Sequence, residues 1–332
     1  MKKILIISLA VVLFVGIFTA CSSYDFDQEQ YKKEINLLSN SELVYDRQVA
    51  DLKGNGDTIF LVAGLSGSVL SNETYNVGIM EADSLFRAYN KSNFDIEKDR
   101  YARKLPEECF TFPYIGMQIP AGKSQVKFPI YLQNLDKLSP DSIYLLDYKI
   151  DPVTTSVFNP KKQEVLLRLF FANEFATTRQ NTFYNYTSSS IITLDINSPL
   201  IKHPTNANQV FPLGENCVRM LAGDETFDEY KKALDKINRM SIKVTIGDKT
   251  SQNPLARVVT IEPYKTLDVV QMTPFEVYSN TYLINIISTP DGRKTYYKEF
   301  RLHYKYRLTA TDPYKEVKAI LRMEYNPRTE LL

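Results

Sequence analysis

Residues 281–325, TYLINIISTPDGRKTYYKEFRLHYKYRLTATDPYKEVKAILRMEY, decide the fold of the C-terminal half of this 332-residue chain. Apolar and polar side chains alternate along this stretch with the two-residue period of half-buried β-strands. The Pro290-Asp291-Gly292 run favours a type I turn followed by a left-handed glycine, which predicts a hairpin. A three-residue loop pairs Tyr282 with Phe300, whereas a two-residue loop leaves Tyr282 opposite Arg301. Because register follows the buried face, we predict the three-residue loop.

Other segments of the C-terminal half show a similar pattern, and they begin near residue 181. Glu225–Asn238 is strongly helical, with apolar side chains at helical spacing along one face and Asp224 as a candidate N-cap. Long antiparallel strands suit either a sandwich or a closed barrel, so we predict such a β-domain over residues 180–332. Its strands are expected at Ser241–Ile246, Arg257–Glu262, Leu267–Gln271, Thr281–Ser288, Lys294–Leu308 and Tyr314–Tyr325.

The N-terminal half is also made of short predicted strands, with one short helix expected at Glu81–Tyr89. Pro129 lies within a clearly alternating strand, which indicates a sheet edge or a break at that point. Short strands at this spacing favour a β-sandwich over residues 41–175, so the predicted fold class is all-β with one or two short helices. The strands are expected at Glu42–Val49, Thr58–Ala63, Cys109–Phe112, Gly116–Ile119, Gln125–Leu132, Ile143–Ile150 and Val165–Phe171.

The N-terminus, MKKILIISLAVVLFVGIFTAC (residues 1–21), has the charge and length of a secretory signal. Small residues directly precede Cys21, and this arrangement resembles the lipobox of bacterial lipoproteins, which are cleaved before a lipidated cysteine. The alternative is an uncleaved anchor, but Ile4–Ala20 is short beside the roughly 20 apolar residues of a membrane span. We therefore predict a signal peptide over residues 1–20, lipidation and membrane attachment at Cys21, and a tether over residues 21–40.

The composition argues against several partners and cofactors. Forty basic and thirty-nine acidic side chains give a net charge of +1, so no nucleic acid partner is expected. After Cys21 only Cys109 and Cys217 remain, and we expect two separately buried thiols in different domains rather than a disulfide. No group of Cys and His residues has metal-ligand spacing. We therefore predict no metal and no cofactor.

Catalytic motifs are absent as well. Gly64–Ser68 superficially resembles a phosphate-binding loop, but it lacks the lysine and the following helix, so we interpret it as an ordinary loop. His203 is expected in a loop and His303 on the solvated face of a strand. A glycoside hydrolase needs two carboxyl groups at a fixed separation, and neighbouring acids such as Asp224 and Glu225 are usually solvated. We therefore predict no catalytic residues.

The 22 tyrosines and 18 phenylalanines are more suggestive. Sugar rings stack their C–H faces on aromatic rings, while their hydroxyls bond Asn, Asp, Arg and Lys side chains. Residues 181–186 and 278–280 combine these groups in predicted loops, and Tyr297 falls on the non-core face of the hairpin. Because tyrosine is also common in strands, each is a candidate only. The candidate glycan-binding residues are Tyr184, Asn185, Tyr186, Tyr278, Tyr297 and Arg301.

Several short motifs resemble a known pair of bacterial domains. Lys104-Leu105-Pro106, Gly116–Phe128 and Ser142–Ile150 are similar to the N-terminal immunoglobulin-like module of Bacteroidetes surface lipoproteins, domain of unknown function 1735. Leu146-Asp147 stands where that module usually has leucine-proline. Asn208–Gly223 and the long final strands resemble domain of unknown function 4361, which often follows that module.

The resemblance implies an immunoglobulin-like sandwich followed by a C-terminal β-domain in a lipid-anchored protein of the outer membrane, exposed at the cell surface. It also implies a non-catalytic role in capturing an oligosaccharide or polysaccharide beside an outer-membrane transporter complex, within a system that uses polysaccharides or host glycans. One alternative is a structural or adhesive surface protein that binds another protein. A third reading is a glycoside hydrolase.

Overall fold

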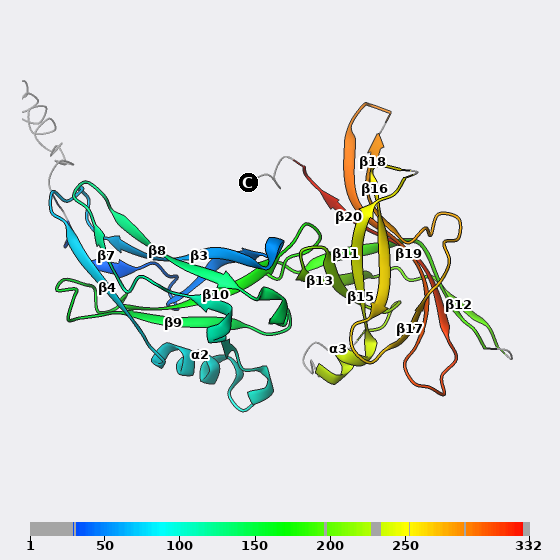
Figure 1. Cartoon of the computed structure of the whole chain (residues 1–332), viewed down its shortest axis with the longest axis horizontal. Coiled ribbons are helices and arrows are strands. Elements are labelled where there is room, and N and C mark those ends of the chain that lie inside the picture. The colour runs from blue at the N-terminus through cyan, green and yellow to red at the C-terminus, as the bar shows by residue number, and fades with distance from the viewer. Residues whose placement is uncertain are drawn as a thin grey trace, which may run out of the picture.

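The computed structural model describes residues 29, 31–195, 198–226, 234–251, 253–288 and 290–327. These residues form two β-rich domains that lie end to end along the longest axis of the molecule (Figure 1). The all-β prediction is confirmed, with short helices placed between strands. None of the described helices is both long and apolar enough to cross a membrane.

The N-terminal domain is a sandwich of two sheets. The first sheet has the order β1-β3-β8-β6, and the second has the order β2-β10-β9-β4-β7 with β5 added to β9. All neighbours are antiparallel except β2 with β10 and β5 with β9. The strands are β1 (Ile35–Leu37), β2 (Val44–Asp51), β3 (Gly56–Leu65), β4 (Tyr75–Glu81), β5 (Arg103–Lys104), β6 (Phe110–Thr111), β7 (Gly116–Ile119), β8 (Gln125–Gln133), β9 (Tyr144–Ile150) and β10 (Glu164–Ala172).

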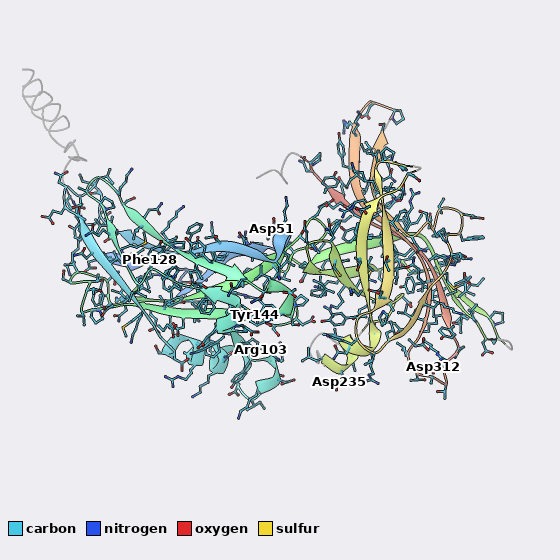
Figure 2. The ribbon with its side chains drawn as sticks, in the orientation of Figure 1. Asp51, Arg103, Phe128, Tyr144, Asp235 and Asp312 are labelled. Carbon is cyan, nitrogen blue, oxygen red and sulfur yellow. The ribbon has the colours of Figure 1, made fainter. Side chains whose placement is uncertain are left out.

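Alternation along β8 explains how the sandwich forms its core. Val126, Phe128 and Ile130 are buried, while the residues between them are more exposed, as the two-residue period predicts. Phe128 and Tyr144 come from different sheets and belong to the same apolar core (Figure 2). Pro129 lies opposite β3 and beyond the short pairing of β8 with β6, so the structure agrees with the expectation of a sheet edge.

Helix α2 (Ser84–Phe94) covers the outer face of the second sheet. Its Leu85 and Phe86 pack against Leu145 of β9 and Leu166 of β10. The predicted helix therefore exists, but it begins later than expected because residues up to Glu81 belong to β4. Four 3₁₀ turns complete the domain: η1 (Lys53–Asn55), η2 (Lys98–Arg100), η3 (Glu107–Cys109) and η4 (Leu135–Lys137).

The C-terminal domain is a closed antiparallel barrel. Its strands are hydrogen-bonded in the order β11-β13-β14-β15-β16-β18-β19-β20, and β20 returns to β11, while β12 and β17 extend the ring at its edges. Closure decides between the two alternatives left open by the sequence, sandwich and barrel. The strands are β11 (Thr182–Thr193), β12 (Leu200–Lys202), β13 (Ala207–Gly214), β14 (Cys217–Leu221), β15 (Ser241–Lys249), β16 (Ala256–Pro263), β17 (Asp268–Gln271), β18 (Thr281–Ser288), β19 (Lys294–Arg307) and β20 (Lys315–Tyr325).

The hairpin of β18 and β19 has the predicted register. Tyr282 lies opposite Phe300 and Ile286 opposite Tyr296, which places both Tyr282 and Phe300 in the barrel core. Gly292 has the positive φ of 81° that the turn requires, whereas Thr289 lies outside the described residues. The predicted helix Glu225–Asn238 falls partly outside them too, and its end overlaps α3 (Leu234–Met240).

The junction between the domains is packed rather than extended. Phe175 is buried in the barrel core against Tyr282, and the Asn173 side-chain nitrogen donates to the Gly214 carbonyl oxygen at 2.8 Å. The barrel therefore begins before residue 180, and the predicted sandwich limit of residue 175 is slightly late. Ile35 and Leu37 are likewise buried in the sandwich, so the tether predicted for residues 21–40 overlaps the folded body. Residues 1–28, including Cys21, lie outside the described part of the chain, so the signal peptide and lipidation stay predictions.

Candidate functional site

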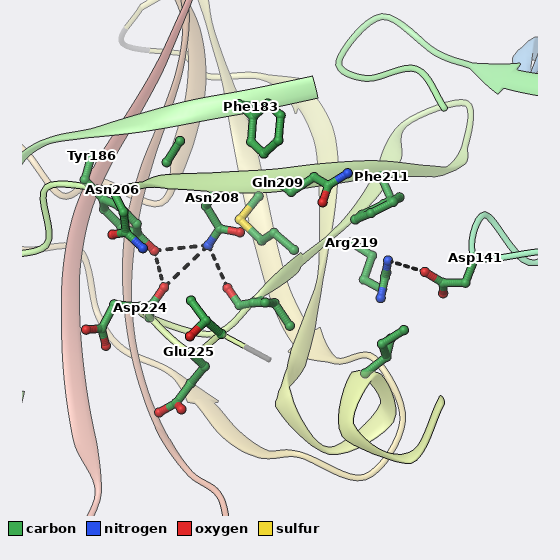
Figure 3. A pocket seen from close by; sticks show the side chains of 16 residues that line it. Asp141, Phe183, Tyr186, Asn206, Asn208, Gln209, Phe211, Arg219, Asp224 and Glu225 are labelled. Carbon is green, nitrogen blue, oxygen red and sulfur yellow. Dashed lines mark hydrogen bonds and ion pairs between the residues drawn. The ribbon is translucent and has the colours of Figure 1, made fainter. Parts of the chain in front are cut away.

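A cavity of about 150 Å³ lies beside β13 and β14, where the chain leaves β14 towards α3 (Figure 3). One water molecule needs roughly 10–15 Å³ of such space, so the cavity has room for a small organic group. Most of its walls come from the barrel, and one side chain comes from the sandwich. Those that matter for its chemistry are Asp141, Phe183, Tyr186, Asn208, Phe211, Arg219 and Asp224.

Asn208 presents a hydrogen-bond acceptor without a partner. Its side-chain nitrogen donates to the carbonyl oxygens of Leu221 at 2.8 Å and Gly223 at 3.4 Å, and to the Tyr186 hydroxyl at 3.1 Å. The Tyr186 hydroxyl in turn donates to the Gly223 carbonyl oxygen, so all three partners of the Asn208 nitrogen are acceptors. This arrangement orients the amide, and Oδ1 has no hydrogen-bond partner among the described residues. A buried acceptor left unpaired costs about 1–3 kcal/mol, which a donating ligand recovers.

Arg219 presents a donor without a partner. Only 2% of this residue is exposed, and its Nη2 donates to Oδ1 of Asp141 in the sandwich domain at 2.7 Å. The guanidinium carbon lies 4.3 Å from the centre of the Phe211 ring. Burial lowers the pKa of Arg219, and the nearby Asp141 carboxylate opposes that decrease. Its Nε has no hydrogen-bond partner within the described ranges.

The loop that borders the cavity is held by two tyrosines of the barrel core. The Gly223 N–H donates to the Tyr304 hydroxyl at 2.7 Å. Gly223 has a φ of 51°, and a Cβ at this position would lie only 2.7 Å from the Tyr306 hydroxyl oxygen. The loop therefore needs glycine here for both its backbone conformation and its close approach to the core.

Two adjacent carboxylates line the cavity next to this loop. Asp224 forms an ion pair with Lys202 of β12, and Glu225 forms one with Lys315 of β20 at 2.5 Å. Each carboxylate is thus neutralised by a lysine from a different strand. Together with the Asp141–Arg219 pair, these contacts give the cavity fixed polar groups rather than free charges.

The predicted residues Tyr184 and Tyr186 have different environments. Both lie on β11, although the sequence predicted a loop at residues 181–186. Tyr186 lines the cavity, and burial raises its pKa while the hydrogen bond from Asn208 opposes the increase. Tyr184 is 0% exposed and its hydroxyl donates to the Phe175 carbonyl oxygen at 2.9 Å. The suggestion that Tyr184 contacts a glycan is therefore wrong for this structure, because the ring belongs to the core.

Asn185, Tyr297 and Arg301 gather on the outer face of the barrel. Asn185 lies opposite Arg322 of β20, which in turn lies opposite Glu299 of β19. Tyr297 and Arg301 flank Glu299 on the same strand and therefore share its face. The Arg301 Nε donates to Glu299 at 2.6 Å, so this arginine is already paired.

Tyr278 lies in the loop before β18 and does not reach the cavity. Its hydroxyl donates to the Ser188 carbonyl oxygen of β11 at 2.7 Å, and the residue is partly buried. The structure thus divides the candidates among the cavity, the core and the outer face. Of the six, only Tyr186 lines the cavity beside β13 and β14.

His303 differs from its predicted solvated position. It is 5% exposed, with Nδ1 2.6 Å from the Thr273 carbonyl oxygen and Nε2 2.8 Å from a Glu316 carboxylate oxygen. The loop before β18 covers this face of β19, which the alternation of residues along the strand cannot indicate. His203 is exposed after β12, in agreement with the prediction.

The two cysteines and the Gly64–Ser68 loop have structural roles. Cys109 is buried in the sandwich, but Cys217 is only partly buried in the barrel, and both are free thiols. The Gly64–Ser68 segment binds a carboxylate of the chain itself, since the backbone N–H of Ser68 donates to Glu29 at 2.8 Å. That hydrogen bond is the main cause that lowers the pKa of Glu29 to about 2. No group of three or more His, Cys, Asp or Glu residues that could hold a metal ion occurs among the described residues.

Apart from Tyr186, the residues that give the cavity its chemistry were not among the binding candidates from the sequence. Arg219 interrupts the apolar strand segment CVRML, and this unusual position is the one signal that could have indicated a functional role. Asn208 and Phe211 lie in the segment Asn208–Gly223, whose sequence indicates a family resemblance but no binding role. Asp141 is 78 residues from Arg219 in the chain and sits in a turn-like Pro-Asp-Ser sequence.

Comparisons with protein families match both halves of the chain. A family model described as an N-terminal domain matches residues 26–157, and one described as a C-terminal domain matches residues 163–322. The boundary between the two matches lies before β10, so the C-terminal match includes the last strand of the sandwich as well as the barrel. A search of curated proteins finds no match.

Solved structures from Bacteroides share the two-domain fold. A protein of unknown function from Bacteroides ovatus is 18% identical with a TM-score of 0.63, and the alignment covers 93% of this chain and 96% of that chain. A multidomain protein including DUF1735 from the same species is 15% identical with a TM-score of 0.62, covering 89% and 95%. An auxiliary nutrient binding protein from Bacteroides thetaiotaomicron is 15% identical with a TM-score of 0.56, covering 86% and 94%.

Proposed function

We propose that this protein is a non-catalytic, lipid-anchored surface protein that binds a glycan in the cavity beside β13 and β14. The observation that carries the proposal is the pair of buried, unpartnered polar atoms, Asn208 Oδ1 and Arg219 Nε. One accepts a hydrogen bond and the other donates one. A sugar hydroxyl does both, so the hydroxyls of a saccharide suit both kinds of atom.

Aromatic side chains support the same class of ligand. Phe183 is 44% exposed at the cavity, and the Phe211 ring lies against Arg219. Figure 3 shows Phe183 and Phe211 on the same side of the cavity as Gln209. An exposed ring beside fixed polar groups suits a sugar, which combines an apolar C–H face with hydroxyl edges.

The pairing of the cavity carboxylates favours binding over hydrolysis. Asp141, Asp224 and Glu225 each form an ion pair with a cationic side chain. A glycoside hydrolase needs one carboxyl that gives up a proton and a second that attacks or activates water. Each of these carboxylates is already engaged by a cation of the chain itself, which supports the non-catalytic role.

Anchoring at Cys21 would make a weak site useful. Lipidation there would hold the protein at the surface of the outer membrane beside a transporter complex, and tethering raises the effective concentration of each binding partner. The similarity to a structure described as a nutrient binding protein supports this setting. A Cys21→Ala variant should lose labelling by a fatty-acid probe, and labelling that persists would contradict the anchor.

A glycan array probed with the chain from Ser22 onward tests the proposed ligand class. Binding to one or more glycans is expected, followed by isothermal titration with the best ligand. Phe183→Ala should weaken that binding about tenfold, the equivalent of ~1.4 kcal/mol. Phe60→Ala is the matched control, because Phe60 is a 37% exposed ring on β3 of the sandwich.

Two results would contradict this proposal. One is the absence of binding to any glycan, and the other is an equal affinity of the Phe183→Ala variant and the original chain. Release of a shortened sugar from a bound glycan would replace binding by hydrolysis.

A further inference from the structure

A second hollow of about 270 Å³ lies between the two domains. One wall is formed by the sandwich, including Tyr101 and Phe170, and the other by Leu234 and Ile237 of α3 in the barrel. We call it the interdomain cleft. It shares Asp141, Gln209, Phe211 and Ile237 with the cavity beside β13 and β14, so the two hollows adjoin.

Hydrogen bonds within the protein hold the lining of the interdomain cleft in place. The junction segment between the domains forms part of this lining, and there the Thr178 N–H donates to the Phe171 carbonyl oxygen at 2.8 Å. The Gln209 side-chain nitrogen of β13 donates to the Asn181 Oδ1 at 2.9 Å. The buried Asp141–Arg219 ion pair joins the domains beside it. These contacts hold both walls in place, so a ligand would meet an organised site.

Two arginines of the cleft have no carboxylate partner. Arg103 of β5 and Arg168 of β10 both line it, and neither forms an ion pair with any described residue. Arg103 lies on the part of the sandwich near the barrel (Figure 2). The Arg168 guanidinium carbon lies 4.7 Å from the centre of the Phe170 ring, which orients it without neutralising its charge.

The other charged groups of the cleft are largely compensated. Arg100 forms an ion pair with Glu97, and Asp141 with Arg219. Asp99 is the carboxylate of the lining that has no ion pair among the described residues. Two unpaired arginines against one unpaired aspartate leave the cleft with an excess of positive charge.

We propose that the interdomain cleft binds the acidic group of a saccharide, with Arg103 and Arg168 as its anion-binding residues. The inference rests on the proposed glycan-binding function and narrows its ligand class to acidic saccharides. A guanidinium donates parallel hydrogen bonds to the oxygens of a carboxylate or a sulfate ester. Phe170 and Tyr101 add aromatic surface for a sugar ring. The adjoining cavity would bind the next sugar unit of the saccharide.

The test compares polysaccharides that differ in their acidic group. The chain from Ser22 onward is titrated with polygalacturonate, which carries carboxylates, with dextran sulfate, which carries sulfates, and with neutral dextran. The double variant Arg103→Gln/Arg168→Gln should bind the preferred acidic polymer at least about tenfold more weakly. Arg47→Gln is the matched control, because Arg47 is an exposed arginine of β2 outside the cleft.

The outcomes separate this inference from the proposed function. Loss of acidic-polymer binding in the double variant but not in Arg47→Gln supports the cleft, and the preferred polymer identifies carboxylate or sulfate. Equal binding by the double variant and the original chain overturns it, as does an equal loss in Arg47→Gln. Binding of neutral glycans alone, or of DNA but no acidic polysaccharide, also overturns it. If the array detects binding to no glycan of any kind, the proposed function itself fails.

Discussion

Two buried carboxylates, Asp147 in the sandwich and Glu299 in the barrel, have pKa values shifted in opposite directions. Burial raises the pKa of Asp147 to about 6, opposed by one hydrogen bond from the Phe86 N–H of α2. Its Oδ1 has no hydrogen-bond partner in the described part of the chain. Burial acts in the same direction on Glu299, but hydrogen bonds from Asn285, Arg301 and Arg322 outweigh it and lower its pKa.

The difference shows that burial alone does not decide the charge of a group. Glu299 is 0% exposed and Asp147 is 7% exposed, yet only Glu299 has cationic donors. The donors come from β18, β19 and β20, which are consecutive strands paired side by side. Asp147 lies on β9 beneath the first turn of α2, where one backbone N–H is its donor. Donors on paired neighbouring strands thus stabilise the buried charge of Glu299, whereas the charge of Asp147 is poorly compensated.

Removing the carboxylate between the domains should have the largest effect. Asp141 resembles Glu299 in being paired with an arginine, but Arg219 is almost fully buried. Asp141→Ala should lower the free energy of unfolding by about 3–5 kcal/mol, because it leaves a buried charge alone. Urea denaturation measures the loss, and the double variant Asp141→Ala/Arg219→Met should recover much of it. A loss that the second change does not reduce would contradict this account.

Neutralising Glu299 should have the next largest effect. Glu299→Gln keeps an acceptor for Asn285 but removes the charge that holds Arg301 and Arg322, so we expect a loss of about 2–3 kcal/mol at pH 7. The lowered pKa means that this stabilisation is present above the ordinary value of 4.5 and is lost as the pH falls through the lowered pKa. The variant and the original chain should therefore converge in acid. Glu324→Gln, an exposed residue opposite Tyr297, is the control and should change little.

The smallest expected effect has the opposite sign. The folded pKa of Asp147, about 6, lies above its ordinary 3.8, so its favourable contribution is complete below pH 4 and disappears as the pH rises through 6. Asp147→Asn should therefore stabilise the sandwich by about 1–2 kcal/mol at pH 8 and leave stability near pH 4 unchanged. Thermal unfolding at both pH values measures this, with the exposed Asp46→Asn as control. Destabilisation at pH 8 would show that the charge of Asp147 is needed.

Much of the fold was predictable because it depends on local alternation. The register of β18 and β19 followed from the apolar residues around one turn, and β7 occurs at the predicted residues. Residues 181–186 were predicted as a loop because polar and aromatic side chains are mixed there, but residues 182–186 begin β11. Strand preference depends on neighbours, and β11 pairs with β12, β13 and β20, of which β20 lies far along the chain.

The candidate site was much less predictable than the fold. Tyr184 and Tyr186 are two residues apart and looked equivalent in sequence. Tyr184 is buried and its hydroxyl donates to the Phe175 carbonyl oxygen, whereas Tyr186 lines the cavity. The unpartnered atoms of Asn208 and Arg219 depend on which backbone carbonyls and which domain lie beside them. No spacing rule relates Asp141 to Arg219, because their contact exists only after both domains have formed.

By itself the sequence determined the all-β class, the division into two domains and the registered hairpin at residues 281–325. These features follow from the period of apolar residues and from turn chemistry, which act between near neighbours in the chain. Tertiary structure alone decided that the second domain closes into a barrel, that Tyr184 is buried, and that Arg219 meets Asp141. Those outcomes depend on contacts between distant segments, whose burial decides which polar atoms are paired and which remain available to a ligand.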